Sequence, residues 1–219
     1  LEQARRFHSH LLNSFLKSEY DASHQQSHPI DIAIIGAGAT GVELAAELHL
    51  ASQELPSYGL NHLKQNDVRI SVIEAADRIL PALPEHLSSA ATRELARLNI
   101  KVLTGNRVTR ITEDAIEFAD GAHLKASIKV WAAGIKAPDF LAQLEGLEVN
   151  RINQLVVHQT LQTTQDENIF AFGDCASCPQ PDSDRPVPPR AQAAHQQAST
   201  LARTLTRRLK GEEAVPYLY

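Results

Sequence analysis

Apolar positions in the first quarter of the chain change from helical spacing to strand spacing and back. Residues 1–19 carry a helical stripe formed by Phe7, Leu11, Leu12, Phe15 and Leu16. A polar linker at 22–28 follows, and Ile30–Ile35 is a short β-branched run of the kind found in buried strands. Helical spacing then resumes and continues to about Glu54. The pattern therefore predicts a helix, a strand and a second helix in succession.

The middle of the chain repeats the strand and helix order and then changes to short strands. Val68–Ile73 is a second β-rich run, and a helix is expected from about Glu85 to Leu98. Short alternating strands are expected at 101–103, 108–111, 115–118 and 123–124. Asp120-Gly121 is typical of a hairpin turn, and Ile128–Ala132 predicts one more buried strand. This order predicts an α/β fold, βαβαβ with a β-meander.

The last third of the chain has a different organisation. Leu155–His158 and Ile169–Phe172 are expected to be strands, and the second leads into Gly173-Asp174. A proline-rich loop, Pro179–Pro189, precedes a helix expected from Arg190 to about Lys210. We therefore expect a second structural unit here.

The first strand is followed by a glycine pattern, Gly36-x-Gly38-x-x-Gly41. Gly36 allows a sharp turn at the strand end, Gly38 leaves room for a pyrophosphate, and Gly41 lets the helix pack closely on the strand. The helix N-terminus presents unpaired N–H groups to the phosphates. The pattern predicts a Rossmann-like dinucleotide site.

An acidic residue, Glu74, ends the second strand. A carboxylate here accepts hydrogen bonds from ribose hydroxyls and repels a 2′-phosphate, which favours NAD over NADP. Its distance from Gly41 exceeds the usual ~20 residues, and we attribute the excess to a polar insertion at Ser57–Asp67. Arg78, close behind Glu74, could soften the discrimination.

Composition narrows the partners. The net charge of −5 offers no basic surplus for a nucleic acid, and no apolar stretch approaches the ~20 residues that span a bilayer. The chain contains no Met and starts at Leu1-Glu2, so we expect it to be a piece of a longer protein, cut at both ends.

Three further segments, in this order, resemble the two-dinucleotide-binding flavoproteins. They are Trp131-Ala132-Ala133-Gly134, the segment from Thr164 through Phe172 to Gly173-Asp174, and Pro188-Pro189-Arg190-Ala191-Gln192-Ala193-Ala194-His195-Gln196. The last, with Cys175 and Cys178 before it, resembles the type II NADH dehydrogenases of proteobacteria, the non-proton-pumping NADH:quinone oxidoreductases. The resemblance covers nearly the whole chain.

The resemblance implies a role for each segment. Ala133 and Gly134 would lie against the nicotinamide of NADH, Gly173 and Asp174 would hold the ribityl chain of FAD, and Gln192 and Gln196 would form the quinone site. Residues 29–135 would be the NADH-binding domain. Residues 136–219 would be the return segment of the FAD-binding domain, and 1–28 would belong to the flavin-domain side.

The resemblance also implies parts that this sequence lacks. The family has another glycine turn for the ADP part of FAD, and a region that attaches to the membrane surface. The whole enzyme would be a peripheral protein on the cytoplasmic face of the bacterial inner membrane. This chain, in contrast, would be soluble, keep NADH binding and be inactive alone. An unpaired strand edge in the return segment would favour a homodimer.

Three side-chain roles compete with simpler ones. Glu43, expected on the first turn of the glycine-turn helix, points at the nicotinamide end in related enzymes, or simply stabilises the helix N-terminus. Gln192 and Gln196 share a helix face, where uncharged amides suit a quinone carbonyl or merely face solvent. Arg190 could orient a quinone headgroup or face solvent.

Cys175 and Cys178 are the only cysteines and form a C-x-x-C pair. A structural metal normally takes four ligands, no second pair exists, and the ten histidines show no ligand spacing, so no metal is expected. An NADH-dependent disulfide reductase using both thiols is an alternative, although reduced thiols in a loop are favoured. A non-enzymatic NADH-sensing module is a second alternative.

Overall fold

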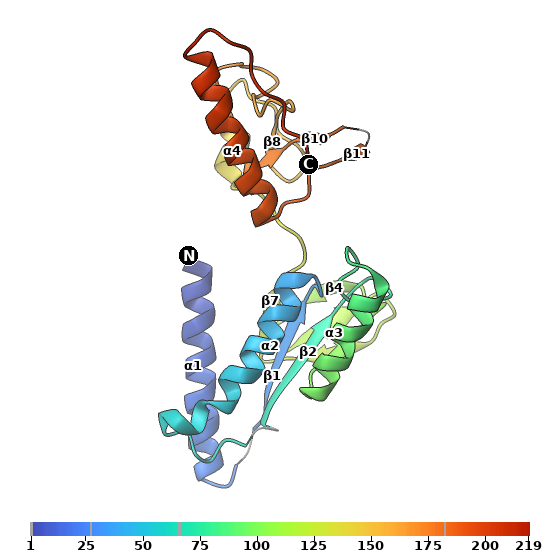
Figure 1. The fold of residues 1–219 in the computed structure, drawn as a ribbon. Helices are drawn as coiled ribbons and strands as arrows, with labels where there is room; N and C mark the ends of the chain where they lie inside the picture. Colours follow the sequence, from blue (N-terminus) through green and yellow to red (C-terminus); the bar gives the residue numbers. More distant parts are fainter. Residues whose placement is uncertain (1, 27, 65–66, 182) are drawn as a thin grey trace. The chain divides into compact units, whose positions relative to one another are not determined.

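The chain divides after Gly134 into two units, Leu1–Gly134 and Ile135–Tyr219 (Figure 1). The computed structural model describes all residues except 1, 27, 65–66 and 182. The side chain of residue 184 is also outside the description.

A parallel sheet forms the centre of the first unit, in the order β3-β2-β1-β7. Its strands are β1 (Ile30–Ile35), β2 (Val68–Ile73), β3 (Lys101–Leu103) and β7 (Ile128–Trp131). The crossovers contain α2 (Ala39–Gln53) and α3 (Glu85–Arg97). This confirms the predicted Rossmann-like α/β fold, and it brings the carboxyl ends of the strands to one edge.

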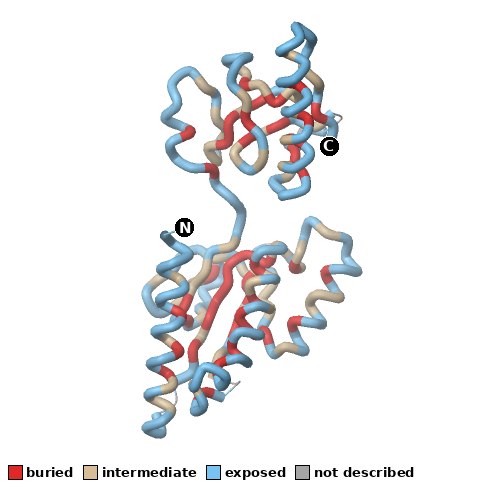
Figure 2. Tube along the Cα trace, turned by 60° about the vertical axis from the view of Figure 1, so that its left-hand side comes forward, coloured by how far each residue is buried: buried red, intermediate tan, exposed pale blue. Residues whose placement is uncertain are grey.

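Both faces of this sheet are covered, which explains why β1 is buried along most of its length (Figure 2). Ile32 and Ile34 face the helical side, in one core with residues of the three helices, namely Leu11, Phe15, Ala45, Leu48 and Leu95. Ala33 and Ile35 face the other side, where they pack with Ile116 and Phe118 of the meander. Burial on both faces accounts for the apolar residues that β1 carries at both inward and outward positions, with Asp31 as its one polar residue.

The meander consists of β4 (Val108–Ile111), β5 (Ala115–Phe118) and β6 (His123–Lys125), paired antiparallel in chain order. Gly121 has φ +85° in the predicted hairpin, a conformation that glycine adopts without strain.

The first helix, α1 (Glu2–Ser23), lies in the first unit. The sequence analysis assigned residues 1–28 to the flavin-domain side. In the structure, α1 contributes Leu11 and Phe15 to the core on the helical side of the sheet, and η1 (Leu55–Tyr58) contributes Leu55 to the same core. The assignment of 1–28 to the flavin-domain side stays a prediction. Leu12 and Leu16 of the predicted apolar stripe are exposed, so only part of the stripe packs on this sheet.

The second unit contains short strands and one long helix. Its elements are η3 (Asp139–Gln143), β8 (Leu155–Val156), η4 (Gly173–Cys175), β9 (Ala176–Ser177), β10 (Pro179–Gln180), β11 (Ser183–Pro186) and α4 (Ala191–Arg208). β8 pairs parallel with β9, and β10 pairs antiparallel with β11. The Pro179–Pro189 segment, expected to be a loop, therefore contains a short ladder.

The prediction of a strand at Ile169–Phe172 is wrong. Only Phe170 makes a β-bridge there, to Gln162. The segment before it turns tightly, because the side chain of Thr163 donates to the carbonyl of Asp166 and the carboxylate of Asp166 accepts from the N–H of Asn168. These local bonds replace a continuous ladder.

Among the described residues, none of the helices is both long enough and apolar enough to cross a membrane.

Candidate functional site

The glycine turn lies at the carboxyl end of β1, against the end of β7. Gly36 has φ +106°, and a Cβ there would come within 2.6 Å of the backbone nitrogen of Ala133. The N–H of Ala132 donates to the carbonyl of Ile35 at 2.7 Å and fixes this approach. Gly36 is therefore required both for its backbone conformation and for the space that it leaves.

The other two glycines differ in what surrounds them. A Cβ at Gly41 would lie 1.9 Å from the carbonyl oxygen of Gly36, whereas a Cβ at Gly38 would have no atom within 4 Å. Gly38 is the N-cap of α2, and no side chain caps this helix end. The first N–H groups of α2 thus face open space, which is the arrangement that binds phosphate at a helix N-terminus.

Glu74 reaches from the end of β2 to the glycine turn. Its Oε2 accepts a hydrogen bond from the N–H of Ala37 at 2.9 Å, and its Oε1 accepts one from the N–H of Ala76 at 3.0 Å. The side chain is half-buried. The structure therefore brings together Glu74, Gly36, Gly38 and Gly41, the residues that the sequence predicted for the dinucleotide.

Glu43 lies on the second turn of α2, which corrects the expectation that it would lie on the first turn. The helix begins at Ala39, directly after the Gly38 cap, and no acidic residue lies in its first turn. Glu43 is exposed. Its stabilising effect on the helix N-terminus is accordingly small, because such effects decline within one turn.

Ala133 and Gly134 are exposed at the end of β7. Gly134 has φ +79° and is the last residue of the first unit. Trp131, the last residue of β7, is 61% exposed, and its Nε1 donates to the carbonyl of Ala133 at 2.9 Å. This bond is local to the segment that follows β7.

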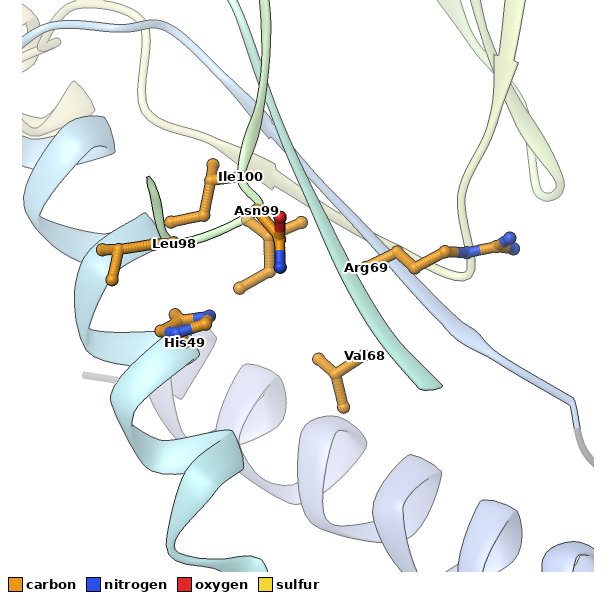
Figure 3. A pocket seen from close by; sticks show the side chains of 7 residues that line it. His49, Val68, Arg69, Leu98, Asn99 and Ile100 are labelled. Atoms are coloured by element: carbon orange, nitrogen blue, oxygen red, sulfur yellow. The ribbon is translucent and has the colours of Figure 1, made fainter. Parts of the chain in front are cut away.

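A pocket at the opposite edge of the sheet is no match for the predicted site (Figure 3). It is lined by the start of β2, by α2 and by the connection between α3 and β3, at His49, Val68, Arg69, Ile70, Leu98, Asn99 and Ile100. His49 pairs with Gln53, and the Arg69 side chain extends from the other side of β2, where it forms two hydrogen bonds with Asp31. Because its polar groups do not converge, we assign it no ligand.

In the second unit, two buried glutamines hold the Gly173-Asp174 turn. Oε1 of Gln197 accepts from the N–H of Gly173 at 2.7 Å, and Nε2 of Gln154 donates to the carbonyl of Asp174 at 3.0 Å. The Asp174 residue itself is exposed. The sequence analysis missed both glutamines. The helical spacing of Ala193, Gln197 and Thr200 would have placed Gln197 on the buried face of α4.

Gln192 and Gln196 are exposed on α4. The hydroxyl of Tyr217 donates to Oε1 of Gln196 at 3.2 Å. Tyr217 and Gln196 line a groove between α4 and the last residues of the chain. Arg190, the N-cap of α4, is exposed.

The two cysteines are free thiols in different environments. Cys178 is fully buried, and burial raises its pKa to about 11. Cys175 is half-buried and donates to the carbonyl of Phe172. Within the described part of the chain, no group of three or more His, Cys, Asp or Glu side chains could hold a metal ion.

Comparison with known proteins identifies relatives over most of the chain. The sequence profile of the pyridine nucleotide-disulphide oxidoreductase family matches residues 8–198. A type II NADH:quinone oxidoreductase of Haemophilus influenzae is 43% identical over 93% of this chain and 48% of its own length. The protein of the same name from Staphylococcus aureus NCTC 8325 is 32% identical over 99% of this chain and 53% of its own length. The chain thus spans about half the length of these curated relatives.

The fold is also found among solved structures. NDH2 of Plasmodium falciparum, solved in complex with NADH, superposes with a TM-score of 0.71 at 18% identity, over 87% of this chain and 54% of that chain.

Proposed function

The chain belongs to the pyridine nucleotide-disulphide oxidoreductase family, and from its similarity to the two bacterial relatives we propose that it is part of a type II NADH:quinone oxidoreductase. Its first unit binds NADH, and its second unit contributes to the FAD and quinone sites. The observation that carries the proposal is the edge of the sheet where Gly38, the uncapped start of α2 and Glu74 converge.

The residues at this edge fit NADH. The space at Gly38 and the free N–H groups of α2 suit the pyrophosphate, and the Glu74 carboxylate suits the unphosphorylated adenosine ribose. Ala133 and Gly134 follow the strand next to the glycine turn, so the nicotinamide end lies against them. Glu43, exposed on the second turn of α2, is proposed to lie at the nicotinamide end.

The turn at Gly173-Asp174 fits the ribityl chain of FAD, because Asp174 is exposed while its backbone is fixed by Gln154 and Gln197. When bound, the nicotinamide and flavin supply the hydride and electron chemistry. The protein residues bind and orient the two rings. Gln196, with Gln192 one turn earlier, donates an N–H to a quinone carbonyl in the groove beside Tyr217.

The cysteine pair gives no support to the alternative of a disulfide reductase. A thiol with a pKa of about 11 is almost entirely protonated at neutral pH, and only the thiolate attacks a disulfide. Attachment of the whole enzyme to the cytoplasmic face of a bacterial membrane, a homodimer and an NADH-sensing role all stay predictions.

Calorimetric titration with NADH and NADPH, using Glu74→Gln and the exposed control Glu47→Gln, tests the proposal. We expect NADH to bind more tightly than NADPH, and Glu74→Gln alone to narrow the gap. Equal affinities in the unmodified chain would remove Glu74 from the site. Absence of binding would refute NADH binding by the first unit.

A further inference from the structure

The backbone of Ala37, in the middle of the glycine turn, is held from two sides. Its N–H donates to Glu74, and its carbonyl oxygen accepts from the N–H of Leu80 at 2.8 Å. Ala37 is completely buried, so neither group can turn to water instead. The shape of the glycine turn therefore depends on the loop that carries Leu80.

That loop has a conformation that needs support. Leu80 has φ +48°, a region that few residues with branched side chains occupy without compensating contacts. The compensation comes from Arg78, which is half-buried. Its Nη1 donates to the carbonyls of Leu83 at 2.9 Å and Leu80 at 3.3 Å, and its Nη2 donates to that of Pro81 at 2.9 Å.

Only arginine can form this arrangement. Its guanidinium is a rigid planar fork of donors that reaches three separate carbonyls at once, whereas a lysine ammonium is a point donor on a flexible stem. Both hydrogens of Nη1 and one of Nη2 are used in this way. The three bonds fix the orientation of the guanidinium toward the loop and leave Nε–H and one hydrogen of Nη2 outside them.

We propose that Arg78 is a positioning residue of the dinucleotide site. It fixes residues 78–83 so that the N–H of Leu80 meets the carbonyl of Ala37 and holds the glycine turn ready for the pyrophosphate. In this role Arg78 supports both nucleotides alike, and we expect it to leave the choice of NADH over NADPH unchanged. The consequence for the ligand rests on the proposed function, while the effect on the turn does not.

A second anchor makes the expected effect of removing Arg78 local. The hydroxyl of Ser88, on α3, donates to the carbonyl of Ile79 at 2.7 Å, and Ile79 is fully buried. Loss of the guanidinium should therefore free residues 80–83 while the start of the loop stays in the core.

The test compares Arg78→Gln and Arg78→Lys with the control Arg97→Gln, which removes an exposed arginine paired with Glu94 on α3. Amide hydrogen exchange at Ala37 and Leu80 is measured without ligand, and NADH and NADPH affinities are measured by calorimetry. In Arg78→Gln we expect exchange at Leu80, whose N–H loses its fixed acceptor, to be at least about tenfold faster. Amide exchange at Ala37 should also become faster, and the melting temperature should match that of the control.

The affinities for NADH and NADPH should both fall by about tenfold, and Arg78→Lys should restore little of either property. Unchanged exchange at both amides would overturn the proposal, as would a loss of NADPH affinity alone, which marks a phosphate ligand. If the unmodified chain binds no NADH, the proposed function fails, and the exchange rates still decide the positioning role. If Arg78→Gln does not fold, Arg78→Lys supplies the same comparison.

Discussion

A Cβ on Gly41 would lie 1.9 Å from the carbonyl oxygen of Gly36. The first turn of α2 therefore rests directly on the backbone of the turn that precedes it, and no side chain fits between them. Gly38, in contrast, has open space and an ordinary backbone conformation, with φ −71°. One glycine of the pattern thus serves the fold, and another serves the ligand.

This difference predicts that a glycine-to-alanine substitution reduces stability much more at Gly41 than at Gly38. Gly41→Ala must push α2 away from β1, and we expect it to reduce the free energy of unfolding by about 2–4 kcal/mol. Gly38→Ala should stay within about 1 kcal/mol of the unmodified chain, because only the N-cap preference changes. Urea unfolding measures both effects.

NADH affinity should change at Gly38, where stability does not. Gly38→Ala should weaken NADH at least about tenfold, because the methyl group occupies the space for the pyrophosphate. NADH binding unchanged by Gly38→Ala would contradict the assignment of this space.

A second prediction concerns Glu19 on α1. Its carboxylate accepts hydrogen bonds from the N–H of Leu63 and from both the N–H and the Nδ1 of His62. Burial pushes the pKa of Glu19 upward, but these hydrogen bonds outweigh it and lower the pKa below its ordinary value of 4.5. A lowered pKa stabilises the folded state above the unfolded value, and the stabilisation is lost as pH falls through the folded value.

Glu19→Gln should therefore reduce stability by about 1–3 kcal/mol at pH 7, and the difference should shrink below about pH 4.5. Thermal unfolding across this pH range is the measurement. Glu2→Gln, an exposed change on the same helix, is the control and should show no such pH dependence. A difference that stays constant down to low pH would rule out the carboxylate as its source.

The third prediction concerns Gln197, which is 2% exposed. Gln197→Ala leaves the N–H of Gly173 without its acceptor, and we expect a loss of about 1–3 kcal/mol in unfolding free energy. Gln196→Ala, at the exposed neighbour, should cost less than about 1 kcal/mol. Urea unfolding followed by circular dichroism compares the two, and equal losses would refute a special role for Gln197.

The fourth prediction concerns the thiols. Cys175 should react with a thiol reagent in the folded chain, and Cys178 should react only after unfolding. Because the pKa of Cys178 is raised from 9.0 to about 11, the folded state holds its proton more tightly than the unfolded state does. Its contribution to stability is complete below pH 9 and is lost toward pH 11. Cys178→Ser should remove this alkaline dependence, and two thiols that react at equal rates would contradict the prediction.

The sequence predicted the first unit well because burial leaves a periodic record. The bounds of β1 follow from a mostly apolar run, which exists because both faces of the sheet are covered, and the bounds of β2 follow from a run rich in β-branched residues. The three glycines were predictable from their spacing. At Gly36 and Gly41 a Cβ would meet backbone atoms, and at Gly38 the missing side chain leaves space for a ligand.

Other features leave no such record. The run Ile169–Phe172 is apolar enough for a strand, but local side-chain bonds at Thr163 and Asp166 decide its conformation. The partners of Arg78 are backbone carbonyls, which every residue carries, so nothing in the sequence distinguishes them. Gln154 likewise acts through a backbone group twenty residues away.

Trp131 gives the chain an optical property that follows from its position. It is the only tryptophan in the sequence, it is 61% exposed, and it is bonded to the carbonyl of Ala133 at the predicted nicotinamide end. Indole emission overlaps the absorption of a reduced nicotinamide but not that of an oxidised one. NADH bound beside Trp131 should therefore quench the tryptophan fluorescence of the unlabelled chain by energy transfer. Bound NAD should cause no such quenching, so the fluorescence intensity should distinguish NADH from NAD.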